Sequence, residues 1–335
     1  MFTSIDITDT SYLNRIFGLK IISTCNIFRM KNLRFAIALL LLFSVQWANA
    51  QRYNARKQYW SLGGSVSMLN YFGDITPSSG LASIDFKQSR IGVGFTAEKK
   101  VGSFISSRFG LMYGAISGDD YNNDYYDTEG GGQRRYMRNL HFRTRMVELS
   151  GGVVIDLFRN NSYFYKRPKI PIPYFTLGVA AVYYNPQAKT PYDLGGTWVN
   201  LRNLETEGVN YSPVTIVVPV GAGIRYKVSP NIDISAEMVL RYAFTDYFDD
   251  VSAGIPENTD GMSELALAMA YRADEDRAMM TEALREPGAV QATRTAEQLA
   301  GKLRGGDAPD MYLATSFKIS YIIGTSRYTA KYRGR

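Results

Sequence analysis

The sequence is poor in the residues from which most catalytic and metal sites are built. Its 335 residues include one cysteine, Cys25, and one histidine, His141. A disulfide framework needs paired cysteines, and zinc sites need several Cys or His ligands, so neither is expected. The sequence contains no GxSxG nucleophile elbow, and the Gly-rich residues 129–133 follow no strand-to-helix pattern that would cradle a phosphate. We therefore expect no enzyme active site and no cofactor.

The chain also has no long apolar run after residue 50, although a membrane-spanning helix needs about 20 apolar residues. Residues 30–50, MKNLRFAIALLLLFSVQWANA, begin with basic residues and end on Ala48-Asn49-Ala50. This pattern predicts a secretory signal peptide, because the apolar stretch 35–45 is too short for an anchoring helix. We expect residues 1–29 to be an upstream extension misassigned in gene calling; the alternative is that Met1 is the true start.

Charged residues of one sign form no long uninterrupted run. The net charge is +7, and residues 1–50 contain five basic and two acidic residues, which leaves the rest of the chain near +4. No run of Lys and Arg indicates a nucleic acid partner. Aromatic residues are abundant at 13%, with 24 Tyr, whereas the hydrophobic content is an ordinary 45%. A transmembrane barrel has this composition, because its alternating strands never build a hydropathy peak.

Residues 214–244 show the clearest pattern in the chain. Every second position of residues 214–228 is apolar, a turn at Ser229-Pro230-Asn231 follows, and residues 232–244 alternate again. A side-chain period of two over about fifteen residues predicts a long strand with one apolar and one polar face. Strands of soluble proteins are usually only about five or six residues long. A hairpin of this length indicates strands that cross a bilayer. Pro219 lacks a donor for a central strand, so we expect a local bulge there.

Similar alternation occurs in eight segments: residues 60–71, 90–100, 104–117, 142–158, 174–184, 214–228, 232–244 and 311–324. Their connections are short on one side, at residues 101–103, 159–173 and 229–231. On the other side they are long, at residues 72–89, 118–140, 185–213 and 252–310. This pattern predicts an all-β fold, an eight-stranded antiparallel transmembrane outer-membrane β-barrel over residues 51–324, with short periplasmic turns and long external loops. The alternative, a soluble lipocalin-like barrel, would turn its apolar face inward.

The polar faces of these strands predict the contents of the lumen, since an eight-stranded barrel has room only for side chains. Charged residues on these faces form a candidate interior ladder: Glu98, Arg108, Glu148, Arg225, Glu237, Arg241 and Lys318. Buried charges must pair, so we expect salt bridges; a proton or ion pathway is the alternative. Aromatic residues near strand ends are expected to form the interfacial girdles: Trp60, Tyr174, Tyr183, Tyr226, Phe244, Tyr247 and Phe248.

Two stretches of the long connection 252–310 have helical composition. Residues 263–285 and 289–303 are rich in Ala, Leu, Met, Glu and Arg, which are good helix formers. We expect 252–310 to be a helical external insertion that acts as a lid, a docking surface or a partly ordered cap. Residues 325–335 form a basic tail on the periplasmic side, which either docks a partner or is solvated.

Acidic pairs lie in the loops, at Asp119-Asp120 and Asp249-Asp250, with Asp124 nearby. Calcium prefers several oxygen ligands, but the EF-hand spacing is absent, so we expect solvated loop carboxylates and no metal site. A lone histidine such as His141 is expected to be structural or incidental.

Four stretches carry a resemblance to a known family: NYFGDI at 70–75, PVGAGIRY at 219–226, RYAFTDYFDDVS at 241–252, and RGGD followed by DMYL at 304–313. Together they resemble PorG-like outer-membrane barrel proteins of the type IX secretion system. The most specific element is TDYFDDVS, whose motif residues are Thr245, Asp246, Tyr247, Asp249 and Asp250. The tail beyond residue 324 departs from the family pattern.

The resemblance implies a non-enzymatic component of the secretion machinery in the outer membrane of a Gram-negative bacterium. The partners it implies are outer-membrane lipid and the periplasmic ring lipoproteins, which are PorK–PorN-like. The alternative function is a general structural or adhesive barrel that acts through its external loops.

Overall fold

The computed structural model describes residues 57–76, 87–123, 126–127, 131–191, 194–252, 254–255, 259, 261–272, 304–306 and 309–324. All of them belong to the compact unit Ala55–Arg335. The predicted upstream extension (1–29), signal peptide (30–50), second helical stretch (289–303) and basic tail (325–335) lie outside the described residues. The described residues form nine strands: β1 (Tyr59–Phe72), β2 (Arg90–Lys100), β3 (Ile105–Asp119), β4 (His141–Asp156), β5 (Ile172–Lys189), β6 (Trp198–Asn200), β7 (Val214–Lys227), β8 (Ile232–Ala243) and β9 (Met311–Ile323).

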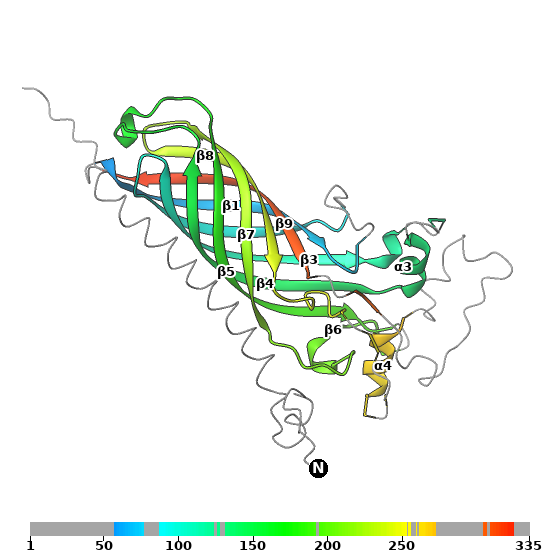
Figure 1. Cartoon of the computed structure of the whole chain (residues 1–335). Coiled ribbons are helices and arrows are strands. Elements are labelled where there is room, and N and C mark those ends of the chain that lie inside the picture. The colour runs from blue at the N-terminus through cyan, green and yellow to red at the C-terminus, as the bar shows by residue number, and fades with distance from the viewer. Residues whose placement is uncertain are drawn as a thin grey trace, which may run out of the picture. The chain divides into compact units, whose positions relative to one another are not determined.

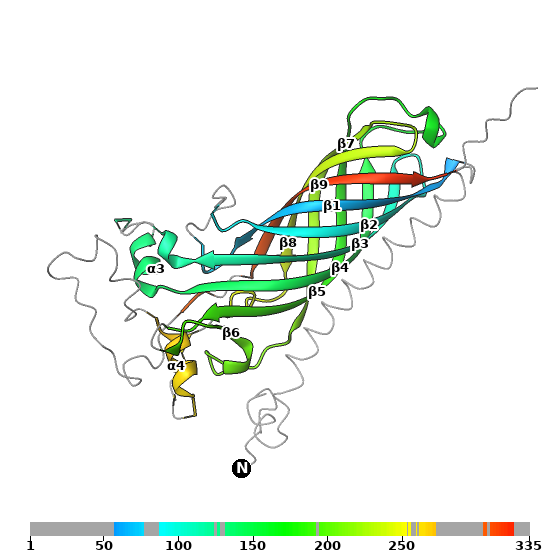
Figure 2. The ribbon, with the colours of Figure 1, turned by 180° about the vertical axis from the view of Figure 1, so that it is seen from behind.

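Eight of these strands form one closed antiparallel barrel. The sheet runs β4-β3-β2-β1-β9-β8-β7-β5, and β4 also pairs with β5, which closes the ring. The short β6 extends the edge of β5 at one end, where Lys189 pairs with Trp198. Figure 1 shows the strands tilted around a common axis, and Figure 2 shows the same ring from behind. The predicted eight-stranded antiparallel barrel is confirmed; β6 was not predicted.

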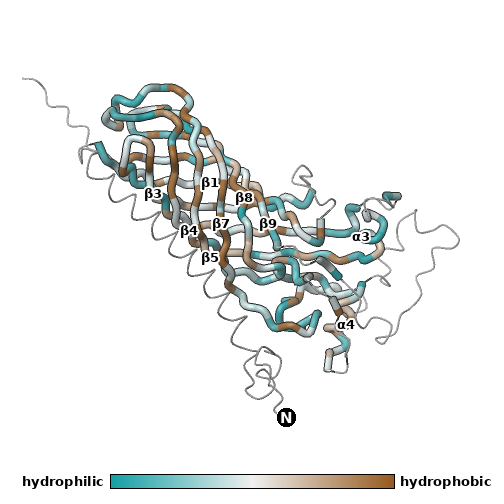
Figure 3. Tube along the Cα trace, in the orientation of Figure 1, coloured by the Kyte–Doolittle hydropathy of each residue, from teal (hydrophilic) through white to brown (hydrophobic). Residues whose placement is uncertain are grey.

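The outer surface of the barrel is apolar. Many outward-facing apolar side chains along neighbouring strands are more than half exposed, among them Val93 at 54%, Leu149 at 64% and Ile319 at 55%. The hydropathy tube in Figure 3 shows apolar positions recurring along the strands. A soluble barrel cannot leave so continuous an apolar belt in water. The lipocalin-like alternative is therefore wrong, and the barrel is a transmembrane one.

Among the described residues, no helix is long and apolar enough to cross a membrane.

Pro219 does not create the predicted bulge. The bridges Leu177–Val220 and Ala180–Val217 keep one register on either side of it, and Pro219 itself pairs with Arg241 on β8. Between these two bridges, the ladder of β5 and β7 has no pair at Gly178 or Val179 of β5. The proline therefore interrupts the ladder locally, as the loss of its N–H requires, without inserting a residue.

The two ends of the barrel differ. At one end, here the turn end, the strands are joined by tight turns, such as the one closed by Val228 N donating to Ile232 O at 3.0 Å. At the other, the loop end, Figure 1 shows α3 (Gly132–Arg138), α4 (Glu264–Ala270) and β6 together. Three 3-10 turns complete the described elements: η3 (Asp120–Asn122) and η6 (Arg202–Leu204) in the long connections, and η4 (Phe164–Lys166) in the link between β4 and β5.

The helical insertion was predicted in part. α4 starts where Ser263 caps the N–H of Ala266, but it ends at Ala270, and Tyr271 is extended at φ −130° and ψ 120°. The predicted helical stretch 263–285 is therefore interrupted at Tyr271, and its residues 273–285 lie outside the described residues. The loop-end helix α3 was not predicted. It follows Gly131, whose φ of +77° places it in the left-handed region that glycine tolerates.

Candidate functional site

The interior of the barrel is the candidate site, and its largest charge cluster surrounds Glu98. This carboxylate accepts hydrogen bonds from Arg108 Nε at 2.9 Å, Lys318 Nζ at 2.7 Å and Arg225 Nη2 at 3.0 Å. The strands explain the convergence: Glu98 and Arg108 are cross-strand partners on β2 and β3, whereas Arg225 and Lys318 point inward from β7 and β9. Glu98 is 6% exposed and Lys318 is 1% exposed. One buried carboxylate thus ties together four strands.

A second carboxylate, Glu237, shares these cations. Its Oε2 lies 2.9 Å from Arg108 Nη1 and 3.9 Å from Lys318 Nζ, and it accepts a hydrogen bond from Tyr174 OH at 2.7 Å. The guanidinium groups of Arg108 and Arg225 also lie over the Tyr174 ring, at 5.6 and 5.1 Å. Tyr174 was predicted to belong to an interfacial girdle. That prediction is wrong, because the outward side chain of its neighbour Phe175 leaves Tyr174 facing the lumen.

Two further ion pairs close the turn end. Lys100 Nζ lies 2.5 Å from Asp156 Oδ2, and Arg225 reaches the same carboxylate at 3.6 Å. Arg167, in the link after η4, donates two hydrogen bonds to Asp233, at 2.7 and 2.8 Å. None of Lys100, Asp156 and Asp233 was in the predicted ladder, although each occupies a polar-face position in the alternation. Counting polar-face charges to the very ends of the strands would have found them.

The remaining ladder residues form a separate pair nearer the loop end. Arg241 Nε and Nη2 donate to the two carboxylate oxygens of Glu148, at 2.7 and 3.3 Å. Tyr312 OH donates to the same carboxylate at 2.7 Å. A forked guanidinium–carboxylate pair is the strong geometry for a buried charge, and the phenol satisfies a further lone pair. All seven predicted ladder residues therefore lie inside the barrel, in two clusters and not in one continuous ladder.

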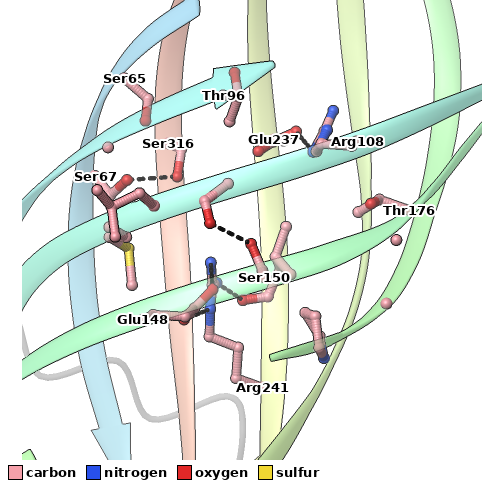
Figure 4. Close-up of a pocket in the computed structure, with 18 of the residues that line it drawn as sticks. Ser65, Ser67, Thr96, Arg108, Glu148, Ser150, Thr176, Glu237, Arg241 and Ser316 are labelled. Atoms are coloured by element: carbon pink, nitrogen blue, oxygen red, sulfur yellow. Dashed lines mark hydrogen bonds and ion pairs between the residues drawn. The ribbon is translucent and has the colours of Figure 1, made fainter. Parts of the chain in front are cut away.

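A small polar cavity of about 70 Å³ lies between the two clusters. Figure 4 shows Arg108 and Glu237 on one side, Glu148 and Arg241 on the other, and the Ser67–Ser316 hydrogen bond between them. Hydroxyl groups line the space: Ser65, Ser67, Thr96, Ser150, Thr176 and Ser316. A chamber of this volume and polarity holds a few water molecules and no larger solute. At this level the lumen therefore has room for water molecules only.

Beyond Glu148, the interior at the loop end is apolar, which the sequence analysis did not predict. The largest hydrophobic cluster includes Leu69, Ile116, Phe142, Met146, Val217 and Tyr312 from the strands. Phe248, from the TDYFDD motif after β8, inserts into it and is 0% exposed. Its ring meets Tyr184 and Tyr312 edge-on at 4.8 and 5.7 Å. The predicted girdle position of Phe248 is wrong, because the segment after Ala243 folds back over the barrel and closes it.

We call residues 245–251 the cap. Thr144 Oγ1 donates to the carbonyl of Phe248, and the Phe248 N–H donates to Asp310 Oδ2 at 2.8 Å. Thr245 hydrogen-bonds Tyr184 at 3.3 Å, and the Tyr247 ring stacks on that of Tyr211 at 4.5 Å. Through these contacts, β4, β5, the connection 185–213 and Asp310, just before β9, all hold the cap.

Two carboxyl groups of the loop end share one phenol. Tyr71 OH lies within hydrogen-bond distance of Asp249 Oδ2, at 2.8 Å, and of Asp310 Oδ1. A phenol has one proton to donate, so the second contact requires a proton on the other carboxyl group. Burial raises the pKa of Asp249 well above its usual range, the charge of Asp310 raises it further, and burial likewise raises the pKa of Asp310. Asp74 and the half-buried Asp246 add negative charge around this pair.

Asp250 is buried separately, with its backbone in the left-handed region at φ +66°. Its carboxylate accepts hydrogen bonds from Thr206 and Tyr211, each at 2.5 Å. Arg304 donates to the Asp250 carbonyl at 3.1 Å and to Glu207 at 3.2 Å. Burial raises the pKa of Asp250 to about 6, although the charge of Arg304 lowers it.

The prediction of solvated loop carboxylates is therefore wrong for Asp249 and Asp250, each 1% exposed, and for Asp120, which is 0% exposed and pairs with Arg138 at 2.7 Å. Their roles are structural contacts within the loop end. Among the described residues, no group of three or more His, Cys, Asp or Glu side chains is arranged to hold a metal ion. His141 lies at the loop-end rim, where its Nε2 accepts a hydrogen bond from Lys189 N at 3.1 Å.

These features define a transmembrane β-barrel of the outer-membrane type, with a lumen filled by ion pairs and a capped loop end. The sequence matches the profile of a family described as Domain of unknown function (DUF6089) over residues 34–267, and the chain belongs to this family. No curated protein matches the sequence.

Several solved outer-membrane barrels are similar in fold. Neisserial surface protein A is 9% identical at a TM-score of 0.33, with 79% of this chain and 96% of that one covered. Ail of Yersinia pestis is 8% identical at 0.32, with 79% and 97% covered. A major outer membrane protein of Thermus thermophilus is 12% identical at 0.34, with 79% and 99% covered. At these scores the likeness adds nothing about function, and the fold assignment depends on the strand pairing.

Proposed function

We propose that this chain is a non-enzymatic outer-membrane component of the type IX protein secretion machinery, where it anchors or positions the periplasmic ring. The observation that carries the proposal is the filled and capped lumen. A barrel whose interior consists of the Glu98 cluster, the Glu148–Arg241 pair and the Phe248 plug offers no path for a solute. The barrel must therefore function through contacts at its two ends, as a protein that anchors another complex does. The TDYFDDVS resemblance supplies the identity of the machinery.

The surface proposed to meet the ring is the link between β4 and β5 at the turn end. This link is held in place: Phe164 packs with Tyr59 and Ile322, and Arg167 is fixed to Asp233 by two hydrogen bonds. The link carries three exposed cationic side chains, Arg159, Lys166 and Lys169. A rigid surface loses little conformational entropy on binding, so it suits a permanent anchor.

The direct test is deletion of the chain in its native bacterium, followed by measurement of secreted proteins that carry type IX sorting signals. We expect their export to fail. Normal export would contradict the secretion role and favour a structural or adhesive barrel acting through its loops. The ordered loop end, where the cap contacts β4, β5 and the connections 185–213 and 252–310, is the observation that favours this second function.

A second experiment tests the surface. Lys166→Glu/Lys169→Glu reverses two charges at the turn end, and Lys87→Glu/Arg134→Glu makes the same change at exposed positions of the loop end. Affinity purification from detergent-solubilised membranes should recover the ring lipoproteins with the control variant and lose them with the first. Equal recovery with both variants would remove the link from the contact surface.

A further inference from the structure

A row of cations lies on the outside of the barrel at the loop end, just beyond the apolar belt. The belt ends with a row across β3, β4 and β5: Tyr113, Val147 and Tyr183, each 40 to 53% exposed. In the next outward row, Arg145 pairs with Asn185, and in the row after it Arg143 pairs with Gln187. Two residues of a strand span about 7 Å. These arginines therefore lie at the depth where a bilayer changes from acyl chains to headgroups.

Two more cations join them. Arg90 donates to Ser117 Oγ at 2.9 Å, and Ser117 is the cross-strand partner of Arg143, so both guanidinium groups flank one residue. Lys189 extends the group at the end of β5 and is exposed. We call these residues the cation rim: Arg90, Arg143, Arg145 and Lys189. The positive charges of Arg145 and Arg90 repel the guanidinium of Arg143.

Repulsion within the rim is not relieved by the described part of the chain. There, no member of the rim forms an ion pair with a carboxylate. The acid in these rows is Asp119, in the outermost row, whose Oδ1 accepts a hydrogen bond from Tyr121 N at 3.1 Å. Inside the same barrel, by contrast, Glu98, Glu148 and Glu237 each contact a cation. Within the described residues these cations lack a carboxylate partner, and cations placed beside a bilayer attract anionic lipid headgroups.

Trp198 organises the rim. The short strand β6 places its ring under the Arg143 guanidinium, at 3.9 Å from the centroid, with Lys189 Nζ at 5.8 Å. His141 meets the Trp198 ring edge-on at 6.2 Å. A guanidinium stacked on an aromatic face can still donate hydrogen bonds from its edges. Arg143 Nη2 donates to Gln187 Oε1 at 3.2 Å, so Arg143 would reach a phosphate through Nη1, beside the exposed Arg145. This arrangement gives a function to the short strand β6, which the barrel does not need for closure.

We propose that the cation rim and Trp198 bind the phosphate groups of a phosphorylated glycolipid in the outer leaflet of the membrane. The acyl chains of such a lipid lie along the apolar belt below Val147 and Tyr183, and its phosphates lie level with Arg143 and Arg145. Free phosphate would lack the acyl-chain contact that brings the lipid to this height. The site lies on the barrel wall and is independent of any partner at the turn end.

The test is a titration of the exported chain, purified in detergent, with bisphosphorylated lipid A, followed by native mass spectrometry. Arg143→Gln/Arg145→Gln should weaken binding about 25-fold, at about fivefold for each cation removed beside a lipid surface. The matched control is Lys99→Gln/Arg159→Gln, which removes two outer cations at the turn end and should change binding less than about twofold. Lipid A stripped of its phosphates should bind the unaltered chain as weakly as bisphosphorylated lipid A binds the arginine variant.

Two outcomes would overturn the proposal: equal binding of lipid A with and without phosphates, or equal loss in both double variants. Heat-modifiable migration on gels verifies that each variant is folded. If the arginine variant does not fold, Trp198→Leu provides the test, because β6 lies outside the closed ring. Loss of the stacked ring should weaken binding about two- to fivefold, and unchanged affinity would contradict the proposed arrangement.

Discussion

Substitution of Glu98 by glutamine tests whether the filled lumen depends on charge balance. The amide keeps the shape of the side chain but removes the charge that contacts Arg108, Arg225 and Lys318 within 3.0 Å. Arg108 would retain Glu237, and Arg225 would retain Asp156 at 3.6 Å. The barrel is expected to form, because its outer belt and strand pairing are unchanged, but to be less stable.

The magnitude follows from the contents of the cluster. It holds three carboxylates, from Glu98, Asp156 and Glu237, and four cations, from Lys100, Arg108, Arg225 and Lys318. Glu98→Gln raises the excess positive charge from one to two. Removal of one partner from a buried ion pair costs about 3–5 kcal/mol. Adding Lys318→Met returns the excess to one, so the double variant should recover about 1–3 kcal/mol.

The assay is urea unfolding and refolding in lipid vesicles, with the folded fraction read from heat-modifiable migration. Glu205→Gln is the control, because Glu205 is exposed in a loop and should change stability by less than about 0.5 kcal/mol. If the double variant is no more stable than Glu98→Gln alone, charge balance does not govern the lumen and the reasoning is refuted.

Three further predictions concern the cap and the two faces of the strands. Burial raises the pKa of Asp250 from 3.8 to about 6 in the folded chain, so the folded state holds this proton more tightly than the unfolded state. Stability should therefore fall by about 3 kcal/mol as pH rises from about 4 to about 6. Urea midpoints measured across this range should fall as pH rises, and Asp250→Asn should remove the part of that fall that Asp250 contributes. The same pH dependence in both chains would contradict the prediction. Phe248→Ala should lower the free energy of unfolding in urea by about 3–5 kcal/mol, because it opens a cavity in the apolar cluster under the cap. The control is Met137→Ala, at a 43% exposed position, which should lower it by less than about 0.5 kcal/mol. Equal losses would contradict the buried position of Phe248. Val220→Asp places a charged side chain toward lipid and should lower the yield of refolding into vesicles. A charged side chain on the lipid face of a barrel destabilises it, by about 2–4 kcal/mol for Arg or Lys at the bilayer midplane and by somewhat less for Asp. Thr96→Asp adds an acid to a lumen with excess positive charge and should refold normally; equal yields would contradict the assigned faces.

Gly223 is not a usable control for this last comparison, although it lies on the polar face of β7. A Cβ atom at Gly223 would stand 2.6 Å from the Tyr174 ring and 2.8 Å from Ala236 O. The glycine therefore makes room for the phenol that hydrogen-bonds Glu237. Alternation alone assigns Gly223 to the lumen, but only the three-dimensional structure shows that no larger side chain fits there.

The period of two was enough to predict the barrel, because each strand has one partner on either side and one face toward lipid. Alternation fixed which way Val220, Leu149 and Ile319 point, and it put Glu98, Arg225 and Lys318 on the inner face. It could not give the stagger between strands. The stagger decides that Glu98 meets Lys318 while Glu148 meets Arg241. It is set by pairings between residues as far apart in the sequence as Trp60 and Ile323.

The loop end was the part that local sequence could not predict. Asp249 and Asp250 have the composition of a solvated corner. Their burial results from Tyr71 of β1, from Thr206 and Tyr211 in the connection 185–213, and from Arg304 in the connection 252–310. Phe248 was assigned to the membrane interface by its aromatic character alone. The end of α4 at Ala270 likewise departs from helix propensity, which favours continuation through residues 271–285.

The seam between β1 and β9 has a consequence for the order of folding. These strands carry the first and last residues of the barrel, and thirteen pairings join them, from Trp60–Ile323 to Phe72–Met311. Until β9 is present, the free edge of β1 exposes a row of unpaired peptide groups that invites association with other chains. Such distant pairing makes closure slow. The β1–β9 seam is therefore expected to be the last part of the barrel to pair.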